Sequence, residues 1–421
     1  MSDGAHVQPR QGRSAFFISH FAFFPFGVTR IMVRLLPRRA AGPIGVDISP
    51  RSVKLIQLDD RRSTVIDAVR WDVPSPADKA FVAKTESSLS GHSAKEREAS
   101  DRTSKPPRPE KGPAGGETAE SAEDRQIVAA LTQALEGRRF CGRDAVLCLD
   151  AHDLLLANVR LAKQVGADMD RLVQQEAAAR IPYAIHEAEI RYLDGADVRQ
   201  GDAVLREITL LSCHRPAIYR KIRLAEAAGL RPVAIDVAPT AILRSYVSQY
   251  RREEDCRRRA MFVHIGMSNT FVVIAQGADV LFARLLDIGG KHFDESVAQH
   301  LDMSLADAIS LRRYNGERRA DQRDPEVSES IDEAARPVVE RFLGELGKCV
   351  RYHSVTFRGQ PLSGIVLGGG EAHESLAETI TARLDVRCEV GDPLRTLQTS
   401  LPLVHRSQWD VAAGLALRSM N

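Results

Sequence analysis

A short polar loop lies between two apolar runs in MFVHIGMSNTFVVIAQ, residues 261–276. The loop carries Gly266, Ser268, Asn269 and Thr270. Backbone N–H groups and hydroxyls in such a turn bind phosphate oxygens without a charged side chain. The pattern therefore indicates a phosphate-binding hairpin, with an ordinary turn in a sheet as the alternative. His264 stands two residues before Gly266, where loops of this kind usually carry an acid.

A matching stretch, IGVDISPRSVKLIQLDDRRSTVIDAVRWDV, opens an earlier compact region at residues 44–73. Both stretches have the order strand, turn, strand, turn, strand. When they are aligned, Asp47 falls on His264 and Ser52 falls on Asn269. A repeat spaced by about half the chain predicts a duplicated domain with a cleft between the copies.

Three consecutive glycines, Gly368 to Gly370, separate an apolar run from a helical pattern in LSGIVLGGGEAHESLAETITARL, residues 362–384. Bare backbone there lets a flat or charged ligand approach closely, with helix N–H groups nearby. A plain strand-to-helix turn needs one left-handed residue, and three glycines exceed that need.

These residues need strands and helices to position them. Runs of Val, Ile, Leu and Phe between turn residues predict two three-stranded antiparallel meanders, at residues 44–73 and 261–289. Apolar residues at helical spacing predict helices over Arg125–Leu135, Phe293–Arg313 and Glu333–Val355. Asp294 and Ser304 are plausible caps that would divide the second into two helices. Pro337 lies early enough in the third to be tolerated.

The bulk composition is that of a soluble globular protein, with 27% charged and 43% apolar residues among 421. A net charge of +2 and an aromatic content of 5% give no signal of nucleic-acid binding. The six cysteines are scattered and form no Cys-x-x-Cys pattern, which indicates buried thiols in a reducing compartment. No apolar run reaches the ~18 residues that a membrane span needs.

Four segments stand apart from the compact regions. Residues 75–124 are rich in Ser, Glu, Lys, Pro and Gly, which predicts a disordered insert. The charge run at residues 251–259 is expected to be a solvated linker between lobes, with a lipid or partner patch as the alternative. Residues 315–330 are expected to be a loop between helices. Residues 15–28 hold six of the fourteen Phe and are either a membrane-surface anchor or, as we favour, sequence upstream of a start at Met32.

Taken together, these segments resemble the actin-like ATPase superfamily, and within it the PilM family of type IV pilus assembly proteins. GVDISPRSVKLIQL and VHIGMSNTFVVI are similar to the family's two phosphate loops, and IVLGGGEAHESLAETI to its adenosine loop. The stretch DRLVQQEAAARIPYAIHEAEI, residues 170–190, resembles a helix ending in Ile-Pro-aromatic within an inserted subdomain of that family. The resemblance covers residues 44–421 and extends to the cytoplasmic part of the secretin-associated secretion platform.

This resemblance implies an α/β actin-like fold, which is a duplicated ribonuclease H-like fold with two lobes, a nucleotide cleft and an inserted α+β subdomain. For the first half of the chain, the implied division is an N-terminal extension at 1–41, subdomain IA at 42–157 with the insert at 75–124, an inserted subdomain IC at 158–235, and a return to IA and linker at 236–260. For the second half, it is subdomain IIA at 261–290 and 331–421, with a small helical subdomain IIB at 291–330.

The resemblance also implies ATP with Mg²⁺ in the cleft. Asp47 fits the carboxylate that holds the metal, because Mg²⁺ requires hard oxygen ligands. The residues expected at the cofactor are Asp47, Ser49, Arg51, Ser52, Lys54, Gly266, Ser268, Asn269, Thr270, Gly289, Gly290, Gly368, Gly369 and Gly370. No residue is assigned a catalytic role.

Two departures from the family pattern bear on this site. Ser49 replaces the family's glycine after Asp-Ile and is followed by Pro50; proline removes an N–H donor, and a left-handed Ser49 would be strained by about 1 kcal/mol. Arg51 could partly compensate with its charge. His264 replaces the second carboxylate, and a neutral imidazole suits zinc better than magnesium, while a cationic one repels metal. Nucleotide binding without appreciable hydrolysis is therefore favoured, ahead of lost binding and of an active ATPase.

The expected function is that of a cytoplasmic scaffold at the inner face of the inner membrane, in a type IV pilus or type II secretion assembly platform. It would dock the N-terminal cytosolic peptide of a PilN-like inner-membrane protein beside residues 158–235, in an apolar groove. The alternative is a catalytically active actin-superfamily ATPase or kinase, and His264 argues against it. A division-type, filament-forming relative is disfavoured because its membrane-binding tail has no counterpart after the last helix.

Overall fold

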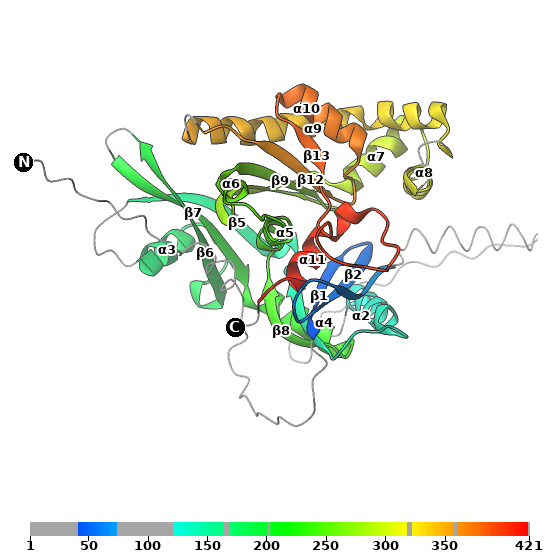
Figure 1. Ribbon diagram of the computed structural model, residues 1–421, viewed down its shortest axis with the longest axis horizontal. Helices are drawn as coiled ribbons and strands as arrows, with labels where there is room; N and C mark the ends of the chain where they lie inside the picture. Colours follow the sequence, from blue (N-terminus) through cyan, green and yellow to red (C-terminus); the bar gives the residue numbers. More distant parts are fainter. Residues whose placement is uncertain are drawn as a thin grey trace, which may run out of the picture.

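Two five-stranded sheets form the centres of two lobes (Figure 1). The computed structural model describes residues 41–73, 121–162, 169–200, 203–317, 322–357 and 360–419, so residues 1–40 of the expected extension and most of the expected insert at 75–124 lie outside the described residues. Lobe I has the strand order β3-β2-β1-β4-β8 and lobe II the order β11-β10-β9-β12-β13. Their bounds are β1 Ala41–Ser49, β2 Ser52–Asp59, β3 Val65–Asp72, β4 Asp144–Cys148, β8 Arg231–Asp236, β9 Arg259–Ile265, β10 Thr270–Gln276, β11 Asp279–Leu286, β12 Gly364–Gly369 and β13 Cys388–Val390.

The two lobes repeat one topology. In lobe I the meander β1–β2–β3 is antiparallel, and β4 and β8 extend it as strands parallel to β1. In lobe II the meander β9–β10–β11 is antiparallel, and β12 and β13 extend it parallel to β9. This repetition confirms the predicted duplication, both meanders and the actin-like fold class.

A third sheet, of order β5-β7-β6, is inserted between β4 and β8 of lobe I. It comprises β5 Leu154–Ala162, β6 Ala188–Gln200 and β7 Ala203–His214, all antiparallel. Helix α3, Met169–Ala178, packs Val173 and Ala177 against Ile208 and Leu210 of this sheet. The expected α+β character of the insertion is therefore observed.

Helices cover the sheets (Figure 1). They are α2 Ala122–Leu135, α4 Arg215–Ala227, α5 Ala238–Val247, α6 Glu253–Arg257, α7 Gly290–His300, α8 Leu305–Glu317, α9 Pro325–Thr356, α10 Glu374–Leu384 and α11 Asp410–Ala416. None of the helices in the described ranges is long and apolar enough to cross a membrane.

Several helix boundaries differ from the predictions. Helix α2 begins within the predicted insert, because Ser121 Oγ accepts the Asp124 N–H and caps it. Helices α8 and α9 extend into the predicted loop at 315–330, so Pro337 lies deep inside α9 and not near its start. The predicted division of 293–313 into two helices is confirmed, and Ser304 Oγ accepts the Asp307 N–H. Asp294 is not a cap, since α7 begins at Gly290.

Helix α11 packs tightly on lobe I, although the predicted division assigns residues 331–421 to lobe II. A Cβ built on Gly45 of β1 would lie 2.2 Å from the Ala412 carbonyl oxygen, and one built on Gly414 would lie 1.8 Å from the Ala241 carbonyl oxygen of α5. The absence of side chains at both glycines lets these backbones touch. The final segment of the chain therefore crosses from lobe II back to lobe I.

Candidate functional site

The first predicted phosphate hairpin, β1–β2, turns at Pro50 and Arg51. The Ser49 hydroxyl donates to the Ser52 carbonyl at 2.9 Å and accepts the Ser52 N–H at 3.2 Å, which closes the turn. Ser49 does not have a positive φ, so the predicted left-handed strain is wrong. The hydroxyls of Ser49 and Ser52 also lie within 3.2 Å of one another, so this hairpin uses its serines internally.

Asp47, the predicted metal ligand, is paired with a lysine. Asp47 and Lys54 are opposite each other on β1 and β2, and Lys54 Nζ lies 2.9 Å from Asp47 Oδ2. Their side chains are only 13% and 10% exposed, so solvent screens the pair little. The charge of the carboxylate is therefore balanced within lobe I.

His264, at the aligned position of the second hairpin, is held by Asp410. The imidazole Nδ1 lies 2.9 Å from both carboxylate oxygens of Asp410, the first residue of α11. Asp410 is fully buried. Burial disfavours the charged imidazole, but the Asp410 charge and hydrogen bond outweigh it, so the pKa of His264 is raised. Sequence reasoning singled out His264 but missed Asp410, whose signal is an acid opening an otherwise apolar helix.

The second loop is tied to the start of α7. The Gly266 N–H donates to the Asn269 carbonyl at 2.9 Å, and the Gly290 N–H donates to the Gly266 carbonyl at 2.9 Å. A Cβ on Gly289 would lie 2.6 Å from the Ser268 carbonyl carbon, so Gly289 allows this close packing. The loop and the predicted glycines at 289 and 290 therefore lie together.

The side chains of this loop differ in how strongly they are hydrogen-bonded within the protein. The buried Thr270 hydroxyl donates to the Ile288 carbonyl at 2.7 Å. Asn269 Nδ2 donates weakly to Asp287 Oδ1 at 3.4 Å. Within the described ranges, Ser268 is half-buried and has no side-chain hydrogen bond. Ser268 is thus the hydroxyl of the loop best placed to contact a ligand.

The glycine triplet serves the protein's own packing at two of its three positions. A Cβ on Gly368 would lie 2.3 Å from Asp410 Oδ2, and one on Gly369 would lie 2.2 Å from the Ile265 carbonyl oxygen. Gly369 also has a φ of +91°, which favours glycine. Gly370 faces open space. The triplet therefore lies beside the second hairpin, and Gly370 is the position that a ligand could approach.

Arg51, at the tip of the first hairpin, reaches into lobe II. Its Nη1 lies 2.9 Å from Asp294 Oδ2 on α7. The other carboxylate oxygen of Asp294 contacts Arg312 of α8, which also contacts Glu371 beside the glycine triplet. Sequence reasoning included Arg51 but missed Arg312 and Glu371 and interpreted Asp294 as a cap.

These groups do not fit a magnesium ion. Mg²⁺ requires an octahedral set of hard oxygen ligands. Here Asp47 already pairs with Lys54, and the second position offers an imidazole whose Nδ1 is bonded to Asp410. A cationic imidazole and an ammonium close to the expected metal position both repel a divalent cation. These side chains therefore do not suit the Mg²⁺ that the actin-like fold implies.

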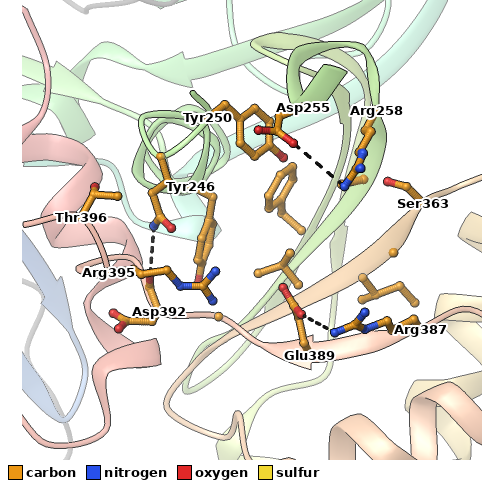
Figure 2. Close-up of a pocket in the computed structure, with 17 residues that line it drawn as sticks. Tyr246, Tyr250, Asp255, Arg258, Ser363, Arg387, Glu389, Asp392, Arg395 and Thr396 are labelled. Carbon is orange, nitrogen blue, oxygen red and sulfur yellow. Dashed lines mark hydrogen bonds and ion pairs between the residues drawn. The ribbon is translucent and has the colours of Figure 1, made fainter. Parts of the chain in front are cut away.

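A cavity of about 380 Å³ lies away from the phosphate hairpins, between the α5–α6 region and the strands β9, β12 and β13 (Figure 2). Tyr246 lines it and stacks on Phe262, with 5.6 Å between ring centroids. Its rim carries matched charges, with Asp255–Arg258 and Arg387–Glu389 pairs drawn as dashed lines in Figure 2. None of the predicted cofactor residues lines this cavity, and its mixed rim does not select one class of ligand.

A family model described as type IV pilus assembly protein PilM matches residues 117–420 of the chain. Among solved structures, the PilM-PilN type IV pilus biogenesis complex is similar with a TM-score of 0.66 and 21% identity, covering 90% of this chain and 98% of that one. This likeness shows a shared α/β actin-like ATPase fold. MreB5 of Spiroplasma citri bound to ADP aligns with a TM-score of 0.45 and 9% identity, over 89% of this chain and 95% of that one.

The cytoplasmic domain of EpsL, an inner membrane component of the type II secretion system of Vibrio cholerae, also aligns. Its TM-score is 0.38 and its identity 8%, over 90% of this chain and 95% of that one.

Proposed function

This chain belongs to the PilM family of type IV pilus assembly proteins, and on that premise we propose that it is a cytoplasmic scaffold of a type IV pilus or type II secretion assembly platform. It acts at the inner face of the inner membrane by docking the N-terminal cytosolic tail of a PilN-like protein. The likeness to the chain of a PilM-PilN complex supports this partner.

The observation that carries the docking proposal is a pair of exposed apolar side chains, one on the insertion and one on α4, where the insertion meets that helix. Ile185 and Tyr219 are 44% and 46% exposed there. Arg215 Nη1 donates to the His186 carbonyl at 3.2 Å, which fixes the segment of Ile185 against the start of α4. Tyr219 lies one helical turn after Arg215 and therefore shares its face.

Two contacts of Tyr183 hold the segment that precedes Ile185. Tyr183 stacks on His214 with 4.9 Å between ring centroids, and its hydroxyl lies 3.0 Å from the Ser212 hydroxyl. Exposed apolar side chains on a fixed backbone suit an extended peptide with apolar anchors. Within the predicted region beside residues 158–235, these contacts support a binding position near Tyr183, Ile185 and Tyr219.

Calorimetric titration with the N-terminal peptide of the PilN-like partner tests the docking. Tyr219→Ala and Ile185→Ala should each weaken binding about tenfold, a change of about 1.4 kcal/mol. Tyr314→Ala is the matched control, because Tyr314 is 60% exposed on α8, outside this surface. No binding to the purified wild-type chain, or equal losses in the control, would contradict the proposal.

The proposal includes a weakened nucleotide site, with ATP bound but not appreciably hydrolysed. The pairing of Asp47 with Lys54 and of His264 with Asp410 supports it. Titrations of ATP with and without Mg²⁺ test it on the wild type and on a His264→Asp, Asp410→Asn double variant. Both changes are needed, since the His264→Asp substitution alone would place a second carboxylate against the buried Asp410.

ATP binding is expected to depend on Mg²⁺ in the double variant and not in the wild type.

The active-ATPase alternative is tested by phosphate release from Mg-ATP. Turnover well above background in the wild type, abolished by Asp47→Ala, would establish an active enzyme instead of a scaffold.

A further inference from the structure

The Arg51–Asp294 pair joins the two lobes at the predicted phosphate site. Arg51 extends from the β1–β2 turn of lobe I, and Asp294 lies on α7 of lobe II. The Asp294 side chain is only 3% exposed, while that of Arg51 is 26% exposed. Asp294 Oδ2 is buried and accepts no hydrogen bond within the described residues, so the nearby charge of Arg51 is what compensates this oxygen.

The lobe II side of this pair is preorganised. Arg312 of α8 contacts Asp294 and Glu371 and donates to the Gly290 carbonyl at 3.3 Å. The ring of Phe293 lies 5.3 Å below its guanidinium. Arg312 therefore fixes Asp294 in position before Arg51 arrives, which lowers the entropy cost of closing the lobes.

Two further contacts cross between the lobes. His264 of β9 bonds to Asp410 of α11, which packs on lobe I. Arg313 of α8 lies 3.4 Å from Asp72 at the end of β3, although both side chains are nearly half exposed and this pair is the weaker one. Charged side chains of the two lobes are thus paired with one another at three places.

We infer that Arg51, Asp294, Arg312 and Glu371 form an interlobe clasp that keeps the lobes closed without a nucleotide. In the fold that this chain resembles, a metal-bound nucleotide would lie between the two hairpins. Here Arg51 places its positive charge between the lobes at that position. The inference rests on the proposed weakening of the nucleotide site. It goes further by assigning closure to these four side chains of the chain itself.

Hydrogen exchange measured by mass spectrometry on the full chain tests the clasp. Arg51→Gln should speed exchange at least tenfold in peptides covering residues 264–294, because α7 and the loop bonded to it lose their anchor on lobe I. Arg51→Lys keeps the charge and should remain within about threefold of the wild type. Arg61→Gln, an exposed arginine in the next turn of the same meander, is the control and should change nothing.

Mg-ATP and metal-free ATP are added to the wild type in the same experiment. Changes below twofold in residues 264–294 are expected, since the lobes are already closed. The clasp is refuted if Arg51→Gln exchanges like the wild type, or if wild-type protection rises tenfold with Mg-ATP.

Titration calorimetry with ATP tests the weakened nucleotide site separately from the clasp. ATP binding that requires Mg²⁺, together with fast exchange in Arg51→Gln, would overturn the weakened site and leave the clasp standing. No Mg²⁺ requirement, together with unchanged exchange in Arg51→Gln, would leave the weakened site standing and remove the clasp.

Discussion

His264 Nδ1 lies 2.9 Å from both carboxylate oxygens of Asp410, and this contact links a strand of lobe II to the helix that packs on lobe I. Gly368 leaves room for this contact, because a side chain at that position would occupy the space of Asp410 Oδ2. Three segments that are distant in sequence, β9, β12 and α11, therefore meet at this pair. The contact also occupies Nδ1 of the imidazole that is aligned with Asp47 in the repeat.

The His264–Asp410 pair should make stability depend on pH. The pKa of His264 is raised in the fold, so its contribution is fully present below the ordinary value of about 6.5 and is lost as pH rises through the folded pKa. His264→Gln should lower the free energy of unfolding by about 1 to 3 kcal/mol at pH 6. Urea denaturation from pH 6 to 9 should show this gap narrowing. A gap that stays constant over that range would contradict the assignment.

The buried cluster around Asp236 should be the strongest electrostatic contribution to lobe I. Asp236 Oδ2 lies 3.0 Å from Arg244 and 2.8 Å from Arg418, and its side chain is fully buried. Burial opposes ionisation, but the two arginines outweigh it and lower the pKa of Asp236. Asp236→Asn should cost about 3 to 5 kcal/mol, because it removes the charge that both guanidiniums share.

The pH dependence of this cluster has the opposite sign to that of His264. Its stabilisation is present above the ordinary carboxyl pKa of 3.8 and is lost as pH falls through the lower folded value. Guanidinium denaturation measures it at pH 7 and pH 3. Asp60→Asn, at an exposed turn, is the control and should stay within about 0.5 kcal/mol. Equal effects of the two substitutions would refute the prediction.

Both meanders and the glycine-rich turn are predictable because their patterns are local, with apolar strands divided by turn residues. The ion pairs are not predictable in this way. Asp410, Arg312 and Glu371 lie on separate elements, and only the folded topology brings each to its partner. Asp294 shows the limit most clearly, since an acid near the start of a helical pattern is interpreted as a cap and instead lies buried beside two arginines.

His353 should make the protein sensitive to mild acid. It is 1% exposed on α9, and no partner of either ring nitrogen is found among the described residues. Burial, followed by the nearby charge of Arg259, lowers the pKa of His353 to about 4. Stability should be constant above about pH 6.5 and fall by about 1.4 kcal/mol per pH unit below it, because the unfolded chain binds the proton first.

His353→Leu should remove this slope without lowering stability at pH 7, since it fills the same site with an apolar side chain. Thermal unfolding between pH 4.5 and 7.5 gives the comparison. The exposed His300→Gln variant should keep the wild-type slope. Parallel slopes in His353→Leu and the wild type would exclude this residue as the origin of the acid sensitivity.

Asn158 should hold the inserted subdomain against lobe II. Its Nδ2 donates to the Ala283 carbonyl at 2.7 Å, and its Oδ1 accepts the Ala283 N–H at 3.3 Å and the Thr209 hydroxyl at 3.0 Å. The amide thereby satisfies the edge of β11, which has no further strand beside it in its sheet. Asn158→Ala should speed exchange of the Ala283 amide about tenfold and cost about 1 to 3 kcal/mol.

Asn158→Asp separates the two halves of this contact, because it keeps the acceptor oxygen and loses the donor. Its Ala283 amide should therefore be protected to an intermediate degree, while the Ala283 carbonyl loses its bond. Amide exchange followed by NMR resolves the three proteins at this position. Because the insertion carries the proposed docking surface, peptide affinity should fall in Asn158→Ala only if docking requires the insertion to rest on lobe II. Unchanged protection of Ala283 in Asn158→Ala would show that other contacts hold the two together.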